Sequence, residues 1–293
     1  MATHLASATK QENIASAHSR YFLCQSCRRC LVAVVGNVLV LAAMWRNSSL
    51  RTAFYILLAG LAFTDLGTDL VTQPIHIVNE LIQLGLIDAK PAMNGIIEKV
   101  RNRSNVFFSF TTMLIITLMS DERWLHMTRR SLFSVRRTFI IVAGVTVISI
   151  TLALYAGQTL TFNFLFLMFC NSITSVAYFK FFRIIWRHQQ QIQANESSQN
   201  FGQPLIDFTK YKKSVFTILC ILFVFYIGYL PMAISLLSNL VLSDREVKRQ
   251  IFSVTKMLLF WSSSLNPLLY LWRMKDIRDE VKQLFRRLLC KHN

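Results

Sequence analysis

The sequence predicts an all-α protein, a bundle of seven transmembrane helices with a short amphipathic eighth helix. The composition is 53% hydrophobic and only 16% charged, and the mean hydropathy is +0.41. Apolar stretches of about 20 residues recur along the chain, and at about 1.5 Å rise per residue each can cross a bilayer. We expect these spans near residues 30–46, 53–82, 104–127, 138–156, 160–186, 214–242 and 251–272.

The spans are expected to be helices because backbone groups in lipid need partners within their own segment or in a closed barrel. The run FIIVAGVTVISITLALY, residues 139–155, lacks the alternation of a barrel strand. We therefore divide the chain into an extracellular N-terminal segment at 1–29, a seven-helix transmembrane domain at 30–272, and an amphipathic helix with a short cytoplasmic tail at 273–293.

The charge distribution indicates how the chain is oriented. It carries 32 Lys and Arg against 15 Asp and Glu, a net charge of +17 that in a soluble protein would suggest nucleic acid binding. With the N-terminus outside, nineteen basic residues fall on the inner side of the spans and eleven on the outer side. The positive-inside rule therefore predicts a cytoplasmic C-terminus. We expect membrane lipids, not nucleic acid, as partners.

Polar motifs inside the spans narrow the function. The first span contains GNVLVL with Asn37, the second contains LAFTDL with Asp65, and SDERWLHM follows the third; the sixth contains FVFYIGYLP and the seventh SSSLNPLLY. In this order the motifs resemble those of the rhodopsin-like (class A) G-protein-coupled receptors, over about residues 35–290. The resemblance implies a receptor in the plasma membrane that passes a ligand signal to heterotrimeric G proteins.

Two alternatives stay open at this point. A seven-helix cation or proton transporter would use Asp65 and Asp69 as a relay, although inverted repeats or broken helices are not visible. The other alternative is a receptor-like protein that does not signal. Arg28 and Arg29 leave only about sixteen apolar residues in the first span, and their length of about 24 Å is short of a full membrane crossing. The sequence shows no paired nucleophile and base and no phosphate loop, so we do not expect an enzyme.

The resemblance implies a hydrated site in the middle of the membrane. Asn37, Asp65 and Asn266 stand where family members surround buried water and a sodium ion, and Thr112 and Ser263 stand where further oxygens are supplied. A carboxylate with neutral oxygens suits a hard monovalent cation. Apart from sodium at Asp65, we expect no cofactor.

The second acid of this span, Asp69, departs from the family pattern. It lies one helical turn outward from Asp65 on the same face. It either widens the ion site, meets a ligand, or pairs with a cation.

The inner end of the third span carries Glu122-Arg123-Trp124, which resembles the DRY motif. The resemblance implies that the arginine is held by the adjacent acid until it meets the G protein. Many relatives add an acid at the inner end of the sixth span, which here reads KYKKSV. We therefore expect Glu122 alone to restrain Arg123, and appreciable signalling without agonist. Tyr178 and Tyr270 match two tyrosines that turn inward on activation.

Prolines and aromatic residues mark candidate switches in the last two spans. Pro231 and Pro267 remove backbone hydrogen bonds and create kinks, which serve as hinges. Phe225 and Tyr229 belong to the sixth-span motif, and Tyr229 stands where the family usually has a tryptophan. For each aromatic residue, ordinary packing explains its position about as well as switching.

The segment after Tyr270 predicts the eighth helix. In LWRMKDIRDEVKQLFRRLLC the apolar residues fall on one helical face and the charges on the other, as in a helix that lies on the inner leaflet. Cys290 follows this basic segment and is a candidate for palmitoylation, with a free thiol nearly as good an explanation.

Polar residues in the outer half are the ligand candidates, and they point to a small molecule, a lipid or a peptide. Lys256 either binds an anionic group together with Arg101 or pairs with an acid inside the bundle. Alternatively, acids near the outer surface could bind a cationic peptide. Glu98 stands near the family's usual cysteine, and the second outer loop, near 157–159, is very short. Melanocortin and lysophospholipid receptors share parts of this pattern. The candidates are Asp69, Glu80, Glu98, Arg101, Asn105 and Lys256.

Overall fold

The computed structural model describes residues 28–83, 85–88, 90–127, 133–156, 160–196 and 208–290. Every regular element among these residues is helical. The first is the helix Arg28–Arg46, followed by the short η1 (Ser48–Leu50). The others are α2 (Ala53–Gly67), η2 (Thr68–Thr72), α3 (Gln73–Gln83), α4 (Pro91–Met127), α5 (Val135–Thr151), η3 (Leu152–Ala156), α6 (Leu160–Glu196), α7 (Phe208–Val241), α8 (Arg245–Arg273) and α9 (Lys275–Cys290).

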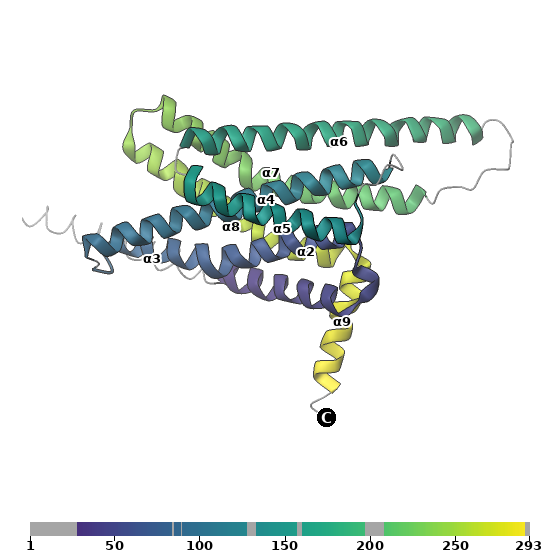
Figure 1. Ribbon diagram of the computed structural model, residues 1–293, viewed down its shortest axis with the longest axis horizontal. Helices are drawn as coiled ribbons and strands as arrows, with labels where there is room; N and C mark the ends of the chain where they lie inside the picture. Colours follow the sequence, from purple (N-terminus) through teal and green to yellow (C-terminus); the bar gives the residue numbers. More distant parts are fainter. Residues whose placement is uncertain are drawn as a thin grey trace, which may run out of the picture.

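The long helices run side by side along one axis, and α9 leaves one end of the bundle at a steep angle (Figure 1). The continuous helix α2–η2–α3 forms the second span, and α5 continues through η3 in the fourth. The first helix and α4, α6, α7 and α8 supply the other five spans, so the predicted bundle of seven helices is confirmed.

By length and composition alone, four helices in the described part of the chain are apolar enough to cross a membrane. These are Arg28–Arg46, Ala53–Ile82, Val135–Tyr155 and Leu165–Ile184. Their large apolar side chains, such as Phe63 and Phe139, point outward at 65% and 59% exposure. Outward-facing apolar residues of this size suit lipid and not water.

The helix α2 lies at the centre of the bundle. It packs against α4, α5 and α8, and its residues Leu57, Leu58 and Leu61 are completely buried. These side chains meet Ile115 and Met119 of α4 in one continuous core. Because α2 is apolar on nearly all sides, its few polar residues stand out as candidates for function.

A π-helical turn, η2, interrupts the second span just outward of Asp65. Such a turn adds a residue to the helix and rotates everything beyond it, and it is frequent at functional sites. Thr72, the last residue of this turn, and Gln73 and His76 beyond it are buried inside the bundle. The irregular turn therefore keeps a line of polar side chains facing inward along the outer half of the span.

Several helices begin earlier or end later than the apolar pattern predicts. The third span was expected near 104–127, but α4 begins at Pro91, the first helical position, where a proline needs no backbone partner. The sixth span likewise begins at Phe208 rather than 214. An apolar pattern marks only the part of a helix that crosses hydrocarbon, and these helices continue into the polar layers on either side.

The first helix includes Arg28 and Arg29, which the sequence analysis assigned to the N-terminal segment. The guanidinium carbon of Arg29 lies 5.8 Å from the ring centroid of Trp261, and its carbonyl oxygen accepts a hydrogen bond from the Ser264 hydroxyl. Both contacts come from α8. The outer end of the first helix is thus continuous across the arginines and is tied to the last span.

Gly36 lets the first helix approach α8 closely. A methyl group added at Gly36 would lie 2.8 Å from both Cβ and Cγ of Pro267, whereas one added at Gly144 on α5 would meet nothing within 4 Å. Both glycines are inside helices, so alanine improves helix propensity equally at the two sites.

We expect Gly36→Ala to lower the thermal unfolding midpoint of the purified protein in detergent, because overpacking of this kind costs about 1–3 kcal/mol. The matched variant Gly144→Ala should leave the midpoint unchanged or slightly raised. Equal midpoints for the two variants would show that the first helix does not pack on Pro267 in this way.

Candidate functional site

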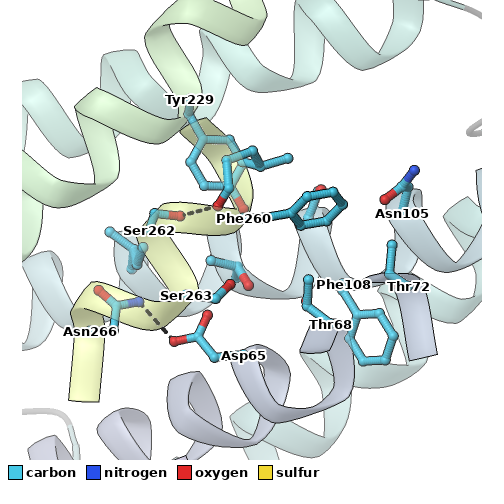
Figure 2. Close-up of a pocket in the computed structure, with 14 residues that line it drawn as sticks. Asp65, Thr68, Thr72, Asn105, Phe108, Tyr229, Phe260, Ser262, Ser263 and Asn266 are labelled. Carbon is cyan, nitrogen blue, oxygen red and sulfur yellow. Dashed lines mark hydrogen bonds between the residues drawn. The ribbon is translucent and has the colours of Figure 1, made fainter. Parts of the chain in front are cut away.

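A polar cavity lies among α2, η2, α4, α7 and α8 in the interior of the bundle (Figure 2). Most of the residues that line it carry hydroxyl, amide or carboxyl groups, and the aromatic rings of Phe108, Tyr229 and Phe260 complete its walls. Thr72 and Asn105 lie at the side opposite Asn266 (Figure 2). Polar groups in the interior of a membrane protein are costly, so a cluster of them marks a candidate functional site.

Asp65 lies on the floor of this cavity and is 4% exposed. The Asn266 amide nitrogen donates a hydrogen bond of 2.8 Å to its Oδ2, and the Ser263 hydroxyl faces the same carboxylate (Figure 2). The carboxylate thus joins the second span to the seventh across 201 positions of sequence. A charge-assisted hydrogen bond of this length is stronger than one between neutral groups.

The third and sixth spans complete the polar floor. The Thr112 hydroxyl donates to the Thr64 hydroxyl at 3.1 Å, and the Tyr229 hydroxyl faces Ser109 and Thr112. The structure therefore brings Asp65, Thr112, Ser263 and Asn266 around one cavity, as the motifs suggested. It also adds Ser109, which no motif singled out.

Asn37 stands apart from this group. Its side chain is completely buried in the first helix, but it is not among the residues that line the cavity. Neither its amide nitrogen nor its amide oxygen has a hydrogen-bond partner among the described residues. A buried amide normally finds a partner in protein or ordered water.

Asp69 does not line the cavity either, although it is completely buried. Its Oδ1 accepts a hydrogen bond of 2.6 Å from the Gln73 amide, and the Cys30 thiol donates to its backbone oxygen. Its Oδ2 has no hydrogen-bond partner within the described ranges. The backbone of Asp69 thus contacts the first helix, and the idea that its carboxylate widens the ion site gains no support from the geometry.

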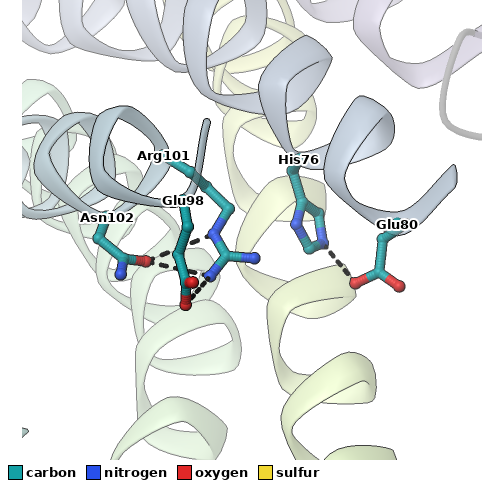
Figure 3. A network of polar contacts seen from close by, with 5 residues as sticks. All are labelled: His76, Glu80, Glu98, Arg101 and Asn102. Atoms are coloured by element: carbon teal, nitrogen blue, oxygen red, sulfur yellow. Dashed lines mark hydrogen bonds and ion pairs between the residues drawn. The ribbon is translucent and has the colours of Figure 1, made fainter. Parts of the chain in front are cut away.

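The other outer ligand candidates form two small polar pairs (Figure 3). Glu80 lies 3.6 Å from the His76 imidazole, and Arg101 lies 3.5 Å from Glu98 while its guanidinium also donates to Asn102. The Arg101 side chain is only 11% exposed. The side chain of Lys256 lies outside the described residues, so its predicted role as an anion ligand or an internal partner stays a prediction.

The C-terminal end of α4 presents Arg123 beside both Glu122 and Phe54. Its Nε lies 3.6 Å from Glu122 Oε2, and its guanidinium carbon lies 3.6 Å from the ring centroid of Phe54. The expectation that Glu122 alone restrains Arg123 is therefore wrong. No spacing or motif pointed to Phe54, because its contact with Arg123 exists only once α2 and α4 are packed together.

The remaining predicted residues lie near this end of α4 or in the hinges. The Lys180 ammonium lies 4.7 Å from the Trp124 ring, and Tyr178 and Tyr270 are both buried. Pro231 lies inside α7, and Pro267 inside α8. The side chains of Phe225 and Cys290 fall outside the described residues.

A family model described as "7 transmembrane receptor (rhodopsin family)" matches residues 36–163 and 155–270. The two matches together extend over most of the chain. They include the residues of the polar floor, the Glu122–Arg123 pair and both hinge prolines.

We expect Asn266→Ala to lower the thermal unfolding midpoint in detergent. Removing the amide leaves a buried carboxylate oxygen without its donor, which costs about 1–3 kcal/mol. Ser172→Ala is the control, because Ser172 is exposed on α6 and its hydroxyl only donates back to the Met168 carbonyl. Indistinguishable midpoints for the two variants would mean that the Asn266–Asp65 bond does not hold the spans together.

Proposed function

Because the chain belongs to the rhodopsin family of seven-transmembrane receptors, we propose that it transmits a signal from an extracellular or membrane-derived ligand to heterotrimeric G proteins. Family membership makes the chain a multi-pass membrane receptor. The observation that carries the coupling step is Arg123, a permanently charged side chain held at the inner end of the bundle by Glu122 and Phe54.

The proposed mechanism is a shift between closed and open arrangements. An agonist shifts this equilibrium by its differential affinity for the two states, and a G protein bound at the inner face is coupled to the agonist reciprocally. Pro231 and Pro267 supply the hinges in α7 and α8. Release of Arg123 from its two partners frees the guanidinium for the G protein.

The proposed orientation has the N-terminus outside the cell and the C-terminus in the cytoplasm. The excess of Lys and Arg on the inner connections supports it. The helix α9 supports it as well, because an amphipathic helix with Arg and Lys on its polar face suits the anionic inner leaflet. A transporter and a silent receptor-like protein are not favoured by the family match.

The ligand is proposed to be a small molecule, a lipid or a peptide that enters the outer half of the bundle. The short connection between η3 and α6 and the acid at position 98 support a place in the melanocortin and lysophospholipid branch of the family. The buried Arg101 and its partner Glu98 are the charged groups best placed to recognise such a ligand from the third span.

We also propose that the cavity binds a sodium ion at Asp65. Hard cations prefer oxygen ligands, and the cavity combines one carboxylate with the hydroxyls of Ser263, Thr112 and Ser109. Neutral oxygens around one carboxylate match a single positive charge better than a divalent ion.

Sodium chloride should raise the thermal midpoint of the wild-type protein relative to choline chloride at equal ionic strength. A ligand at 100 times its Kd stabilises by about 2.7 kcal/mol, which corresponds to several degrees. Asp65→Asn should abolish the sodium effect. Asp69→Asn, which removes a buried acid that does not line the cavity, should keep it, and loss in both variants or in neither would contradict the assignment.

Without agonist, the wild-type receptor should accelerate nucleotide exchange on purified G proteins at least about fivefold over Arg123→Ala, within the usual range of coupling between two sites. Exchange is measured in membranes with matched receptor density, across several G-protein subtypes. Equal rates for the two receptors would exclude basal coupling through Arg123.

A further inference from the structure

We propose that Phe54 is the positioning residue that holds Arg123 in the resting state of the bundle. The first turn of α7 contains no acid that could hold it. The proposal rests on the proposed coupling to G proteins and adds how the coupling arginine is restrained. It concerns a residue at the start of α2, far from the polar cavity.

The geometry of the contact is that of a strong cation–π interaction. The guanidinium carbon of Arg123 lies 3.6 Å from the centroid of the Phe54 ring, well within the limit of about 6 Å. Phe54 is 4% exposed and the Arg123 side chain 23% exposed. Such contacts strengthen when water is excluded, and the Phe54 ring is almost completely shielded from water.

Glu122 is a weaker partner than its position in the motif suggests. Its Oε2 lies 3.6 Å from Arg123 Nε, whereas a charge-assisted hydrogen bond between such groups measures about 2.7–2.9 Å. The acid therefore neutralises the guanidinium from one side without a short hydrogen bond. Both contacts measure 3.6 Å, but the ring lies well within the range of a cation–π contact, whereas the carboxylate lies beyond hydrogen-bond distance.

The described first turn of α7 carries no acid that could supply the restraint. Residues 210, 212 and 213 of this helix are all lysine. The resting state therefore needs a partner on another helix, and α2 provides the ring.

Phe54 is itself held in place through α9. The neighbouring Tyr55 packs edge-on against its ring at 5.8 Å, and the Tyr55 hydroxyl donates to Asp276 Oδ2 at 3.0 Å. A second link joins the Asn47 amide nitrogen to Glu280 Oε1 at 2.8 Å. The two carboxylates of α9 thus fasten the segment that enters α2 and carries the Phe54 ring.

The first test compares agonist-independent nucleotide exchange by Phe54→Leu, Phe54→Tyr and the matched control Phe63→Leu, which removes a lipid-facing ring from the same helix. We expect Phe54→Leu to raise exchange about tenfold, which corresponds to about 1.4 kcal/mol. Phe54→Tyr and Phe63→Leu should stay near the wild-type rate, and Asp276→Asn should rise less than Phe54→Leu. An unchanged rate in Phe54→Leu, or an equal rise in Phe63→Leu, would overturn the proposal.

The second test needs no G protein. Thermal midpoints are measured in detergent for Phe54→Leu, Arg123→Gln and the double variant, with Phe63→Leu replacing Phe54→Leu in a control cycle. The two losses should be non-additive in the first cycle and additive in the control. Additive losses in both cycles would refute the contact. If no variant, nor the wild type, activates a G protein, the coupling proposal fails, while a non-additive first cycle still supports the role of Phe54.

Discussion

Hydrocarbon offers no hydrogen-bond partner, and this constraint decides where the polar side chains of the spans lie. Asp65 is paired with Asn266, Thr112 with Thr64, and Thr117 with Thr174, each time across two helices. These pairs lie inside the bundle, while the outward faces carry large apolar residues. The second, third, fifth and seventh spans are therefore joined by polar contacts that could not be satisfied in an arrangement that faced lipid.

The helix α2 brings the two functional regions onto one rigid element. Asp65 lies at the floor of the polar cavity, and Phe54 lies under Arg123 at the inner end. Eleven residues separate them, about 16 Å along a helix. A displacement of α2 that changes the cavity must also move the ring against which Arg123 rests, so the second span is a physical link between the two sites.

The two ends of the bundle restrain their charged groups by different means. At the cavity, a carboxylate is held by neutral donors that leave room for a small cation. At the inner end, a guanidinium is held by an aromatic face and by a carboxylate that lies beyond hydrogen-bond distance. Both arrangements keep a charge in place without a short ion pair, which would cost more to break when the bundle changes state.

The sequence by itself determined the fold class, the order of the spans, and the choice of Asp65, Arg123 and Asn266 as candidate site residues. The length of an apolar stretch and a local motif are properties of neighbouring residues, so both can be read without the fold. Only the tertiary structure decided that Phe54 meets Arg123, that Asn37 and Asp69 lie outside the cavity, and that Ser109 lies on its wall. Those outcomes depend on how helices rotate and pack. A single π-helical turn at η2 is enough to change which side chains face inward, and no periodicity in the sequence announces it.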